Sequence, residues 1–339
     1  MWNLLVLSNK PFKQDFRKYL MKAACRANGR AAHIHFGAHI TLTRSNTDIS
    51  LYARSTNIET IARTVTGYLG EGRTIVLSGL GCNFSLNAFR LPKQIRSSVV
   101  LYDIYDDLLY DTRGMKRLGK WAIDYFWKIA CNNHLILDPA LSRRYRHAFH
   151  LDNASHLQSN RRQLTQIRRM IYAGSIDDRV DFAWMHAVAK TSIPIDIYGW
   201  VHCSSQTAAQ YLERLCDEEE NITYKGPYDN DELGEILLHY DVGLLPYKTD
   251  HKMTKHVNPD KLRHYLNAGL EVLASPIPAV MRHVSYVHIA NTQANFLHIL
   301  AAMLSERRQT KWPVDEHSWD TRWSALVGMI EQTRNGRAD

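Results

Sequence analysis

The sequence lacks the features that mark several common classes of protein. It has only five cysteines in 339 residues, and none of them forms a C-x-x-C pair. This scarcity predicts a reducing compartment with no disulfide framework and no structural zinc site. No run of 18 or more apolar residues occurs, so we expect no transmembrane helix. The first ten residues have no basic region before their short apolar run, which predicts a β-strand and not a signal peptide.

Two familiar phosphate-binding signatures are also missing. No G-x-G-x-x-G follows the first predicted strand, which argues against the usual dinucleotide site, and the G-x-x-x-x-G-K-[ST] loop is absent. A D-x-D pair occurs at Asp229 and Asp231, but it precedes a predicted helix, where a carboxylate caps free N–H groups. We therefore favour capping over metal binding, and we expect neither a metal nor a resident cofactor.

Positive charge is in excess. The chain has 42 lysines and arginines against 34 acidic residues, a net charge of +8 and an isoelectric point of about 9.2. Such a balance indicates an anionic partner, either nucleic acid, anionic lipid or a phosphorylated small molecule, although it also serves solubility alone. The basic residues form no recognised nucleic-acid-binding module, so we expect no nucleic-acid partner.

Two predicted helices concentrate this charge. The first, over residues 14–27, places Lys18, Lys22 and Arg26 four residues apart, and an anionic surface opposite them would relieve their repulsion. The second, over residues 115–128 (MKRLGKWAIDYFWK), combines basic and aromatic side chains in a pattern suited to a membrane interface. A solvated face over an ordinary core stripe explains the second helix equally well.

Strands alternate with helices through both halves of the chain, which predicts an α/β fold with parallel sheets covered on both faces. Strands are expected at 4–7, 32–36, 75–77, 99–102, 135–137, 171–173, 195–198, 222–225, 242–245 and 272–274. Helices are expected at 14–27, 58–68, 115–131, 182–189, 206–216, 231–239 and 259–267. A polar, basic stretch at 151–169 predicts a linker. We therefore expect Rossmann-like domains over 1–155 and 168–310, and a helical tail over 311–339 that packs back on the first domain.

Chemically useful side chains follow two of the predicted strands, at the sheet edge where such folds bind ligands. After the strand at 242–245 come Tyr247, Asn258 and Lys261, in a cationic, hydrogen-bonding loop suited to a phosphate-bearing ligand. After the strand at 99–102 comes an acidic cluster of Asp103, Asp106 and Asp107. Clustered carboxylates raise one another's pKa and can poise a general base, whereas a solvated acidic turn is the alternative.

Five segments in order resemble GT-B glycosyltransferases, in particular the donor domain of bacterial enzymes that assemble exopolysaccharide or teichuronic acid. These segments are Gly174–Phe182 (GSIDDRVDF), Gly226–Leu233 (GPYDNDEL), Asp241–Tyr247 (DVGLLPY), Asn258–Gly269 (NPDKLRHYLNAG) and Trp319–Arg322 (WDTR). The resemblance of the N-terminal half is weaker and rests mainly on Tyr102–Leu108. It implies a GT-B fold of two Rossmann-like domains that face a central cleft, with the acceptor bound by the first domain and the donor by the second.

A more distant similarity is to the glucuronosyltransferase of xanthan biosynthesis. It implies that Tyr247 and Lys261 belong to the donor site and that Asp106 is the catalytic aspartate, while His264 takes the place of a glutamine. Many retaining members carry a glutamate in this helix, and His264 in its place favours inversion. The usual N-G-V-D of the linker is replaced here by Asp152–Ser155 (DNAS), so no role is carried over to that segment.

The resemblance implies a specific chemistry. Lys261 and the N–H groups at the start of its helix would bind the donor's diphosphate. Gly174 and Ser175 would let the backbone approach the phosphates, with help from Arg179. Asp106 would deprotonate the acceptor hydroxyl, with Asp103 or Asp107 as substitutes.

We therefore expect a metal-independent, inverting glycosyltransferase. It would move a sugar from a nucleotide-diphosphate donor, UDP rather than GDP, to a lipid-linked glycan acceptor in cell-surface polysaccharide synthesis. Its expected place is the cytoplasm, peripherally on the anionic inner face of the plasma membrane, which the basic N-terminal domain would contact. A nucleotide-sugar epimerase of the same fold and a non-catalytic binding or scaffold protein are the alternatives.

Overall fold

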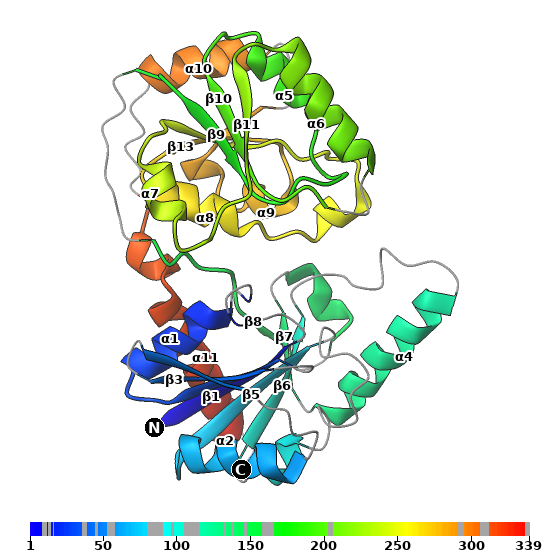
Figure 1. The fold of residues 1–339 in the computed structure, drawn as a ribbon, viewed down its shortest axis with the longest axis vertical. Helices are drawn as coiled ribbons and strands as arrows, with labels where there is room; N and C mark the ends of the chain where they lie inside the picture. The colour runs from blue at the N-terminus through cyan, green and yellow to red at the C-terminus, as the bar shows by residue number, and fades with distance from the viewer. Residues whose placement is uncertain are drawn as a thin grey trace. The chain divides into compact units, whose positions relative to one another are not determined.

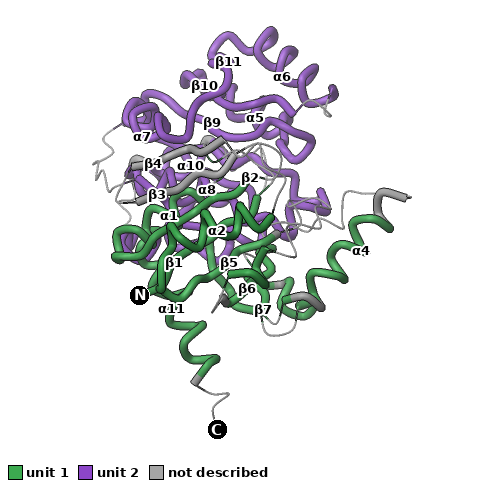
Figure 2. Tube along the Cα trace, turned by 60° about the horizontal axis from the view of Figure 1, so that its bottom comes forward, with its two compact units in different colours: residues 1–152, 318–339 green, residues 153–317 purple. Residues whose placement is uncertain are grey.

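A computed structural model gives the fold of the chain. It describes residues 1–8, 12, 15, 17–35, 39–44, 47–52, 58–79, 91–95, 98–104, 115–131, 133–136, 139–145, 148–157, 166–202, 206–290, 295–305 and 312–335. The chain divides into two compact units, coloured separately in Figure 2. Unit 1 comprises residues 1–152 and 318–339, and unit 2 comprises residues 153–317. Unit 1 is thus built from both ends of the sequence.

Unit 1 contains a sheet of eight strands within the described residues (Figure 1). The strands are β1 (Trp2–Ser8), β2 (Ala31–His35), β3 (His39–Arg44), β4 (Thr47–Tyr52), β5 (Arg73–Gly79), β6 (Ser98–Ile104), β7 (Asn133–Ile136) and β8 (Ala148–His150). Their order is β4-β3-β2-β1-β5-β6-β7-β8. The pairs β2–β3 and β3–β4 are antiparallel, whereas the other neighbours are parallel.

Helices of unit 1 accompany this sheet. They include α1 (Arg17–Arg26), α2 (Ile58–Leu69), α4 (Met115–Ala130) and α11 (Trp319–Asn335), with a short 3-10 helix, η3 (Pro139–Arg143), before β8. The core collects alternate residues of the strands, such as Leu5, Val76 and Tyr102, against α2 and α4. Because both faces of the central strands are covered, β1 is buried along its whole length.

The helix α11 packs along α1 and ties the end of the chain to its beginning. Tyr19 and Trp319 stack with ring centroids 6.5 Å apart, and Arg26 donates two hydrogen bonds to Asp320, at 2.8 and 3.0 Å. The anionic partner predicted for the basic face of the first helix is therefore, for Arg26, a side chain of this protein. Lys18, on the same helix, is buried.

Unit 2 is a doubly wound domain. Its strands are β9 (Met170–Ala173), β10 (Ile195–Tyr198), β11 (Ile222–Gly226), β12 (Val242–Leu245), β13 (Glu271–Ala274) and β14 (His288–Ile289). Their order is β11-β10-β9-β12-β13-β14, and every neighbouring pair is parallel. This is the 3-2-1-4-5-6 order of a Rossmann domain, in which ligands bind beyond the carboxyl ends of the strands near the point where the order reverses, here between β9 and β12.

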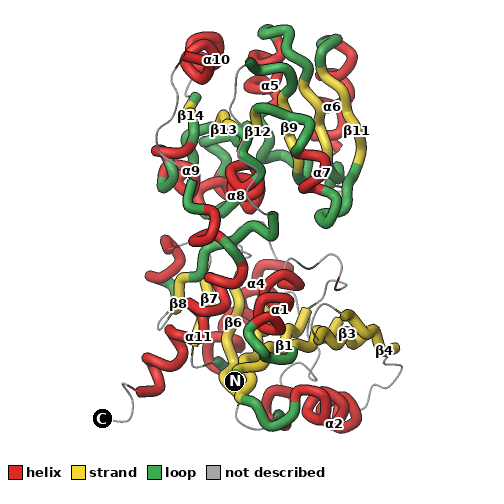
Figure 3. Tube along the Cα trace, turned by 90° about the vertical axis from the view of Figure 1, so that its left-hand side faces the viewer, coloured by secondary structure: helices red, strands yellow, loops and turns green. Residues whose placement is uncertain are grey.

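Helices cover both faces of this sheet, as Figures 1 and 3 show. One face carries α5 (Phe182–Ala189), α6 (Gln206–Glu218) and α10 (Phe296–Ser305). The other carries α7 (Leu233–Leu237), α8 (Asp260–Asn267) and α9 (Pro278–Met281). The described part of unit 2 also includes the short 3-10 helices η4 (Lys252–Lys255), η5 (Val284–Tyr286) and η7 (Val314–His317).

The predicted α/β organisation is confirmed, with differences at the margins. The elements α5, β10 and β12 have the predicted bounds. The hairpin of β3 and β4 was not predicted. Its alternation of apolar and polar residues over 39–44 and 47–52, around Ser45 and Asn46, is a readable hairpin signal. Asp229, predicted to cap a helix, instead accepts a hydrogen bond from the N–H of Asp231, and the helix begins later, at Leu233.

Within the described residues, no helix combines the length and the apolar character needed to cross a bilayer.

Candidate functional site

The predicted donor residues of unit 2 gather at the carboxyl edge of its sheet. The loop after β9 carries Gly174, Ser175 and Arg179, the loop after β12 carries Tyr247, and α8 begins at this edge with Lys261 in its first turn. Backbone contacts join the two loops: Lys248 N–H donates to Arg179 O at 2.9 Å, and the N–H of Asp181 donates to the carbonyl of Pro246 at 2.8 Å. These hydrogen bonds hold the loops after β9 and β12 together at the carboxyl edge of the sheet.

Lys261 lies at the centre of this arrangement. Its ammonium group donates a 3.1 Å hydrogen bond to the hydroxyl of Tyr172 and lies 4.3 Å from the centroid of that ring. The centroid of the Tyr247 ring lies 5.4 Å from the same ammonium. The side chain is buried, so a lysine charge is held among aromatic rings with little water around it.

Glycines make room for this ammonium. A Cβ atom at Gly174 would lie 2.2 Å from Lys261 Nζ and 2.5 Å from its Cε. A Cβ atom at Gly199, after β10, would lie 1.8 Å from the carbonyl oxygen of Gly174. Because neither distance is possible for real atoms, both positions require glycine to keep the loop and the ammonium where they are. Gly174 thus lets the Lys261 side chain lie directly against the backbone of the first loop.

Burial alters the acid–base behaviour of Lys261. It lowers the pKa of the ammonium to about 8, with Arg179 adding to the effect, while Asp260 and Asp177 oppose it. A buried cation that is only partly compensated gains a great deal from an anion, because the low local dielectric strengthens the attraction. Lys261 is therefore suited to receive a phosphate group.

Arg179 is already paired. Its guanidinium donates to both carboxylate oxygens of Asp177, and the Asp177 side chain also accepts from the Arg179 N–H. Burial alone would raise the pKa of Asp177, but the contacts with Arg179 outweigh it and leave the pKa below its ordinary value. Ser175 contributes its backbone to the site, since its carbonyl accepts a 2.5 Å hydrogen bond from Tyr172.

Tyr247 and Asn258 hold the scaffold of the edge. The N–H of Tyr247 donates to the Ser275 hydroxyl at 3.1 Å, and its ring is buried beside Lys261. The side-chain oxygen of Asn258 accepts from the fully buried Arg263 at 2.9 Å, while its backbone oxygen accepts from the side-chain amide of Asn153. Asn258 thus fixes the turn that starts α8.

His264 lies one turn beyond Lys261 on α8 and is also buried. Its Nδ1 shares a 2.9 Å hydrogen bond with Ser155 Oγ, and its ring packs edge-on against His156 with centroids 5.0 Å apart. Burial lowers the pKa of His264, with the nearby Arg263 adding to this and Asp260 opposing it, so the imidazole is neutral at pH 7. A neutral His264 imidazole can donate or accept a hydrogen bond with a ligand, and it adds no positive charge that would repel the Lys261 ammonium.

Ser155, Asn153 and Tyr172 were not predicted as parts of this site. Asn153 and Ser155 lie in the stretch read as a linker, but the structure buries both of them within unit 2. Their small polar side chains gave no periodic signal. Tyr172 lies in an apolar strand, and nothing in the sequence shows where its hydroxyl points.

Of the three predicted carboxylates, only Asp103 lies within the described residues; Asp106 and Asp107 lie outside them. Asp103 is at the carboxyl end of β6, but both of its oxygens accept hydrogen bonds from the buried guanidinium of Arg17, at 2.5 and 2.8 Å. Such a pair anchors α1 to the sheet. The suggestion that Asp103 could substitute as a base is therefore not supported by its surroundings, because both oxygens are engaged.

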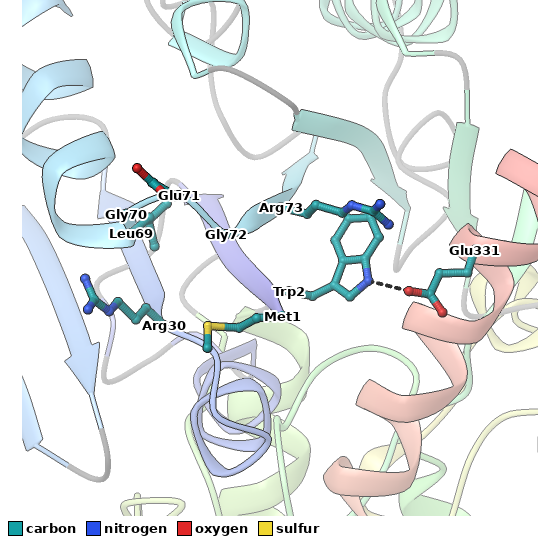
Figure 4. Close-up of a pocket in the computed structure, with 9 residues that line it drawn as sticks. All are labelled: Met1, Trp2, Arg30, Leu69, Gly70, Glu71, Gly72, Arg73 and Glu331. Atoms are coloured by element: carbon teal, nitrogen blue, oxygen red, sulfur yellow. Dashed lines mark hydrogen bonds between the residues drawn. The ribbon is translucent and has the colours of Figure 1, made fainter.

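A surface pocket of about 670 Å³ lies elsewhere in unit 1 (Figure 4). It is at the amino-terminal edge of the sheet, where β1 and β5 begin. Its polar groups serve the fold: Trp2 donates to Glu331 of α11 at 2.9 Å, and Arg30 donates to the carbonyl of Tyr68. Among the described residues, no cluster of three or more His, Cys, Asp or Glu side chains is arranged to hold a metal ion.

No protein-family profile matches the sequence, and no curated protein does so either. Solved structures match it in fold. The glycosyltransferase AviGT4, involved in avilamycin A biosynthesis, aligns with a TM-score of 0.62 at 10% identity, over 99% of this chain and 98% of its own. The lipopolysaccharide outer core galactosyltransferase WaaB aligns with a TM-score of 0.59 at 8% identity, over 98% of this chain and 100% of its own.

The same fold also serves a different reaction class. A putative UDP-N-acetylglucosamine 2-epimerase from Listeria monocytogenes aligns with a TM-score of 0.52 at 8% identity, over 99% of this chain and 97% of its own. The chain spans 64% of the length of the pneumococcal O-GlcNAc transferase GtfA, with a TM-score of 0.49. At these identities the alignments establish the fold alone: this chain has the GT-B fold, as predicted.

Proposed function

We propose that this protein is a glycosyltransferase that binds a nucleotide-diphosphate sugar at the carboxyl edge of unit 2. The observation that carries the proposal is the buried ammonium of Lys261, held by Tyr172 and Tyr247 against the glycine backbone of the first loop. A fold shared with AviGT4 and WaaB supports it. The expected donor is a UDP sugar rather than a GDP sugar. The aligned Listeria protein is named as a putative epimerase of a UDP sugar, which agrees with this expectation.

In this proposal the site serves the leaving group. As the bond between sugar and phosphate breaks, negative charge grows on the diphosphate. The Lys261 ammonium and the N-terminal turn of α8 would stabilise that charge. An ammonium that is already desolvated acts strongly, because no water has to be removed when the charge develops. The protein's own charges thus do the work that a bound cation does in other transferases, so the proposed reaction needs no metal.

The proposed stereochemistry is inversion. His264 occupies the helix position where many retaining relatives carry a glutamate, and a buried neutral imidazole brings no negative charge there. A base would then deprotonate the acceptor hydroxyl as it attacks the anomeric carbon. Asp106 is the proposed base and Asp107 its nearest substitute, both still predictions from the sequence.

The proposed acceptor is a lipid-linked glycan on the anionic inner face of the plasma membrane, in the synthesis of a cell-surface polysaccharide. The charge of the two units supports this. The ranges of unit 1 hold 25 lysines and arginines against 14 acidic residues, a net charge of +11, whereas unit 2 holds 17 against 20, a net charge of −3. Unit 1 is thus the part that an anionic surface would attract.

Incubation with a panel of nucleotide sugars tests the proposal. Release of nucleoside diphosphate that depends on an added lipid-linked acceptor is the expected result. An epimerase is the second candidate, supported by its shared fold, and it would convert the free donor into its isomer with no acceptor present. Donor binding without turnover under any condition would contradict both enzymes and favour a binding or scaffold protein.

A further inference from the structure

The helix α4 of unit 1 turns its apolar side toward solvent. Its residues at i, i+3, i+4, i+7 and i+8 form one stripe, and all five are exposed. They are Leu118, Trp121, Ala122, Tyr125 and Phe126. The four large side chains are 62%, 55%, 54% and 47% exposed, in chain order without the alanine. An amphipathic helix on a globular domain normally turns such an apolar stripe to the core. The exposure of this stripe on α4 therefore requires a structural explanation.

A polar anchor fixes the orientation. Asp124, on the opposite side of the helix, is almost completely buried and accepts hydrogen bonds from the hydroxyls of Tyr102 and Tyr145, at 2.9 and 2.8 Å. Lys128, one turn further, forms a 2.8 Å ion pair with the same carboxylate. Rotating α4 to bury its aromatic stripe would pull a satisfied carboxylate out of this network and leave two buried hydroxyls without partners.

The core side of the helix is filled by other residues. Trp127 is buried and stacks on Tyr102, with ring centroids 6.1 Å apart, while Ile123 packs against the same core. The exposed stripe is therefore additional to the residues that hold α4 in place. Figures 1 and 2 both show α4 at the margin of unit 1, extending away from its sheet. On the exposed side, Trp121 and Tyr125 stack on each other with centroids 5.4 Å apart.

We infer that the exposed face of α4 inserts into the interface of an anionic lipid bilayer. Trp and Tyr are the side chains that favour the boundary between headgroups and acyl chains, and Leu and Phe add apolar area just below it. The helix lies on the unit with a net charge of +11, which anionic headgroups attract. A lipid bilayer can bury the exposed face of a single helix, because it needs no partner helix of matching shape.

This inference deepens the proposed function, because it names the part of unit 1 that would meet the membrane carrying the acceptor. It can nevertheless be tested without donor or acceptor. Sedimentation with vesicles of phosphatidylglycerol and phosphatidylcholine measures binding directly, and vesicles of phosphatidylcholine alone give the contribution of charge. The full-length chain should bind the anionic vesicles more tightly, and added salt should weaken that binding.

The decisive comparison uses two matched double variants. Trp121→Ala with Tyr125→Ala removes the centre of the α4 stripe, whereas Trp200→Ala with Tyr211→Ala removes one tryptophan and one tyrosine that are exposed on unit 2. We expect the first pair to weaken vesicle binding by roughly tenfold or more and the second to leave it unchanged. Because all four side chains are exposed, both variants should keep their folds, which circular dichroism verifies.

Equal binding by the two double variants, or no vesicle binding by the unaltered chain, would overturn the inference. So would light scattering that shows a dimer dissociated by the α4 variant, since the stripe would then cover a second copy. Failure of the proposed function would instead appear as absent UDP binding or transfer with vesicle binding intact. The two failures are therefore distinguishable.

Discussion

Ser155 and His264 lie 109 positions apart in the sequence and share a buried 2.9 Å hydrogen bond in unit 2. Ser155 Oγ also accepts a 3.1 Å hydrogen bond from the N–H of Leu157, so its hydroxyl is held from the backbone side as well. The segment that leads into unit 2 therefore sets the orientation of a ring on α8, one turn from Lys261.

Removing the Ser155 hydroxyl should destabilise unit 2. Ser155→Ala leaves the buried Nδ1 of His264 without its partner, which costs about 1–2 kcal/mol of the free energy of unfolding. Ser155→Thr keeps a hydroxyl and should recover most of that loss. Urea unfolding monitored by circular dichroism measures both variants. If the alanine variant were as stable as the unaltered protein, the hydrogen bond would contribute nothing.

Replacing Lys261 should weaken donor binding selectively. Lys261→Ala removes a charge-assisted contact to the diphosphate, and calorimetry should show roughly a 10- to 100-fold loss of affinity for UDP. The matched control is Lys190→Ala, which removes a largely exposed lysine on the same unit and should leave the affinity unchanged. An equal loss in both variants would indicate a general effect of charge and would contradict the assigned contact.

Donor binding should depend on pH through the same residue. The pKa of Lys261 is about 8 in the free protein, so the ammonium loses its proton as the pH rises through 8. A bound diphosphate favours the charged form, and UDP affinity should therefore fall above pH 8, with uptake of a proton on binding. Without ligand, the folded state holds fewer protons than the unfolded state between pH 8 and the ordinary pKa of 10.5, so the free energy of unfolding should rise with pH there.

Calorimetry in buffers of different ionisation enthalpy measures the proton uptake. Lys261→Gln serves as the control, because it cannot titrate and should show no uptake from this position. A pH dependence of the same size in that variant would assign the effect to another group.

A methyl group at Gly174 should displace the Lys261 ammonium. The added Cβ would lie 2.2 Å from Nζ, so in Gly174→Ala the lysine must leave the Tyr172 hydroxyl, and UDP affinity should fall roughly tenfold. Gly67→Ala, in α2, is the control, because its Cβ meets no atom within 4 Å. That change should be neutral or stabilise by about 0.5–1 kcal/mol, as alanine is the better helix former. Equal UDP affinity in the unaltered and Gly174→Ala proteins would rule out the close approach.

Asp103, at the carboxyl end of β6, and Asp106, which follows it in the sequence, should have different roles. Asp106→Asn is expected to abolish transfer while UDP binding persists, which a transfer assay and calorimetry test together. Asp103→Asn instead breaks the buried pair with Arg17 and should destabilise unit 1 by about 3–5 kcal/mol, as chemical unfolding would show. Full transfer activity in Asp106→Asn would exclude this residue as the base.

Much of the fold was predictable because many of its strands and helices are short apolar runs with clear breaks. The strand β12 and the helix α5 are two such cases, and their predicted bounds match the structure. The hairpin of β3 and β4 was missed because its apolar residues alternate with threonine and serine, so neither strand stands out as an apolar run. A search for two-residue periodicity would have found it.

The site was predictable where a residue's type and its motif agree. Lys261 and Tyr247 follow a buried strand in a recognisable pattern, and the structure brings them together. Tyr172 and Ser155 were hidden for a physical reason. Each of them belongs to the site because it forms a hydrogen bond with a residue about 90 or more positions away. The sequence pattern does not show which distant residues come into contact.

The packing of α11 on α1 has a consequence for how the protein is made. The strand β1 and the helix α1 of unit 1 are translated before unit 2, but the residues that cover α1 near Tyr19 arrive only after all of unit 2 has been translated. Unit 2 is encoded by one continuous segment and can fold as soon as it emerges. Until α11 has been translated, one face of α1 in unit 1 lacks the residues that cover it. A chain released early, before residue 319, would therefore contain a complete unit 2 and an incomplete unit 1.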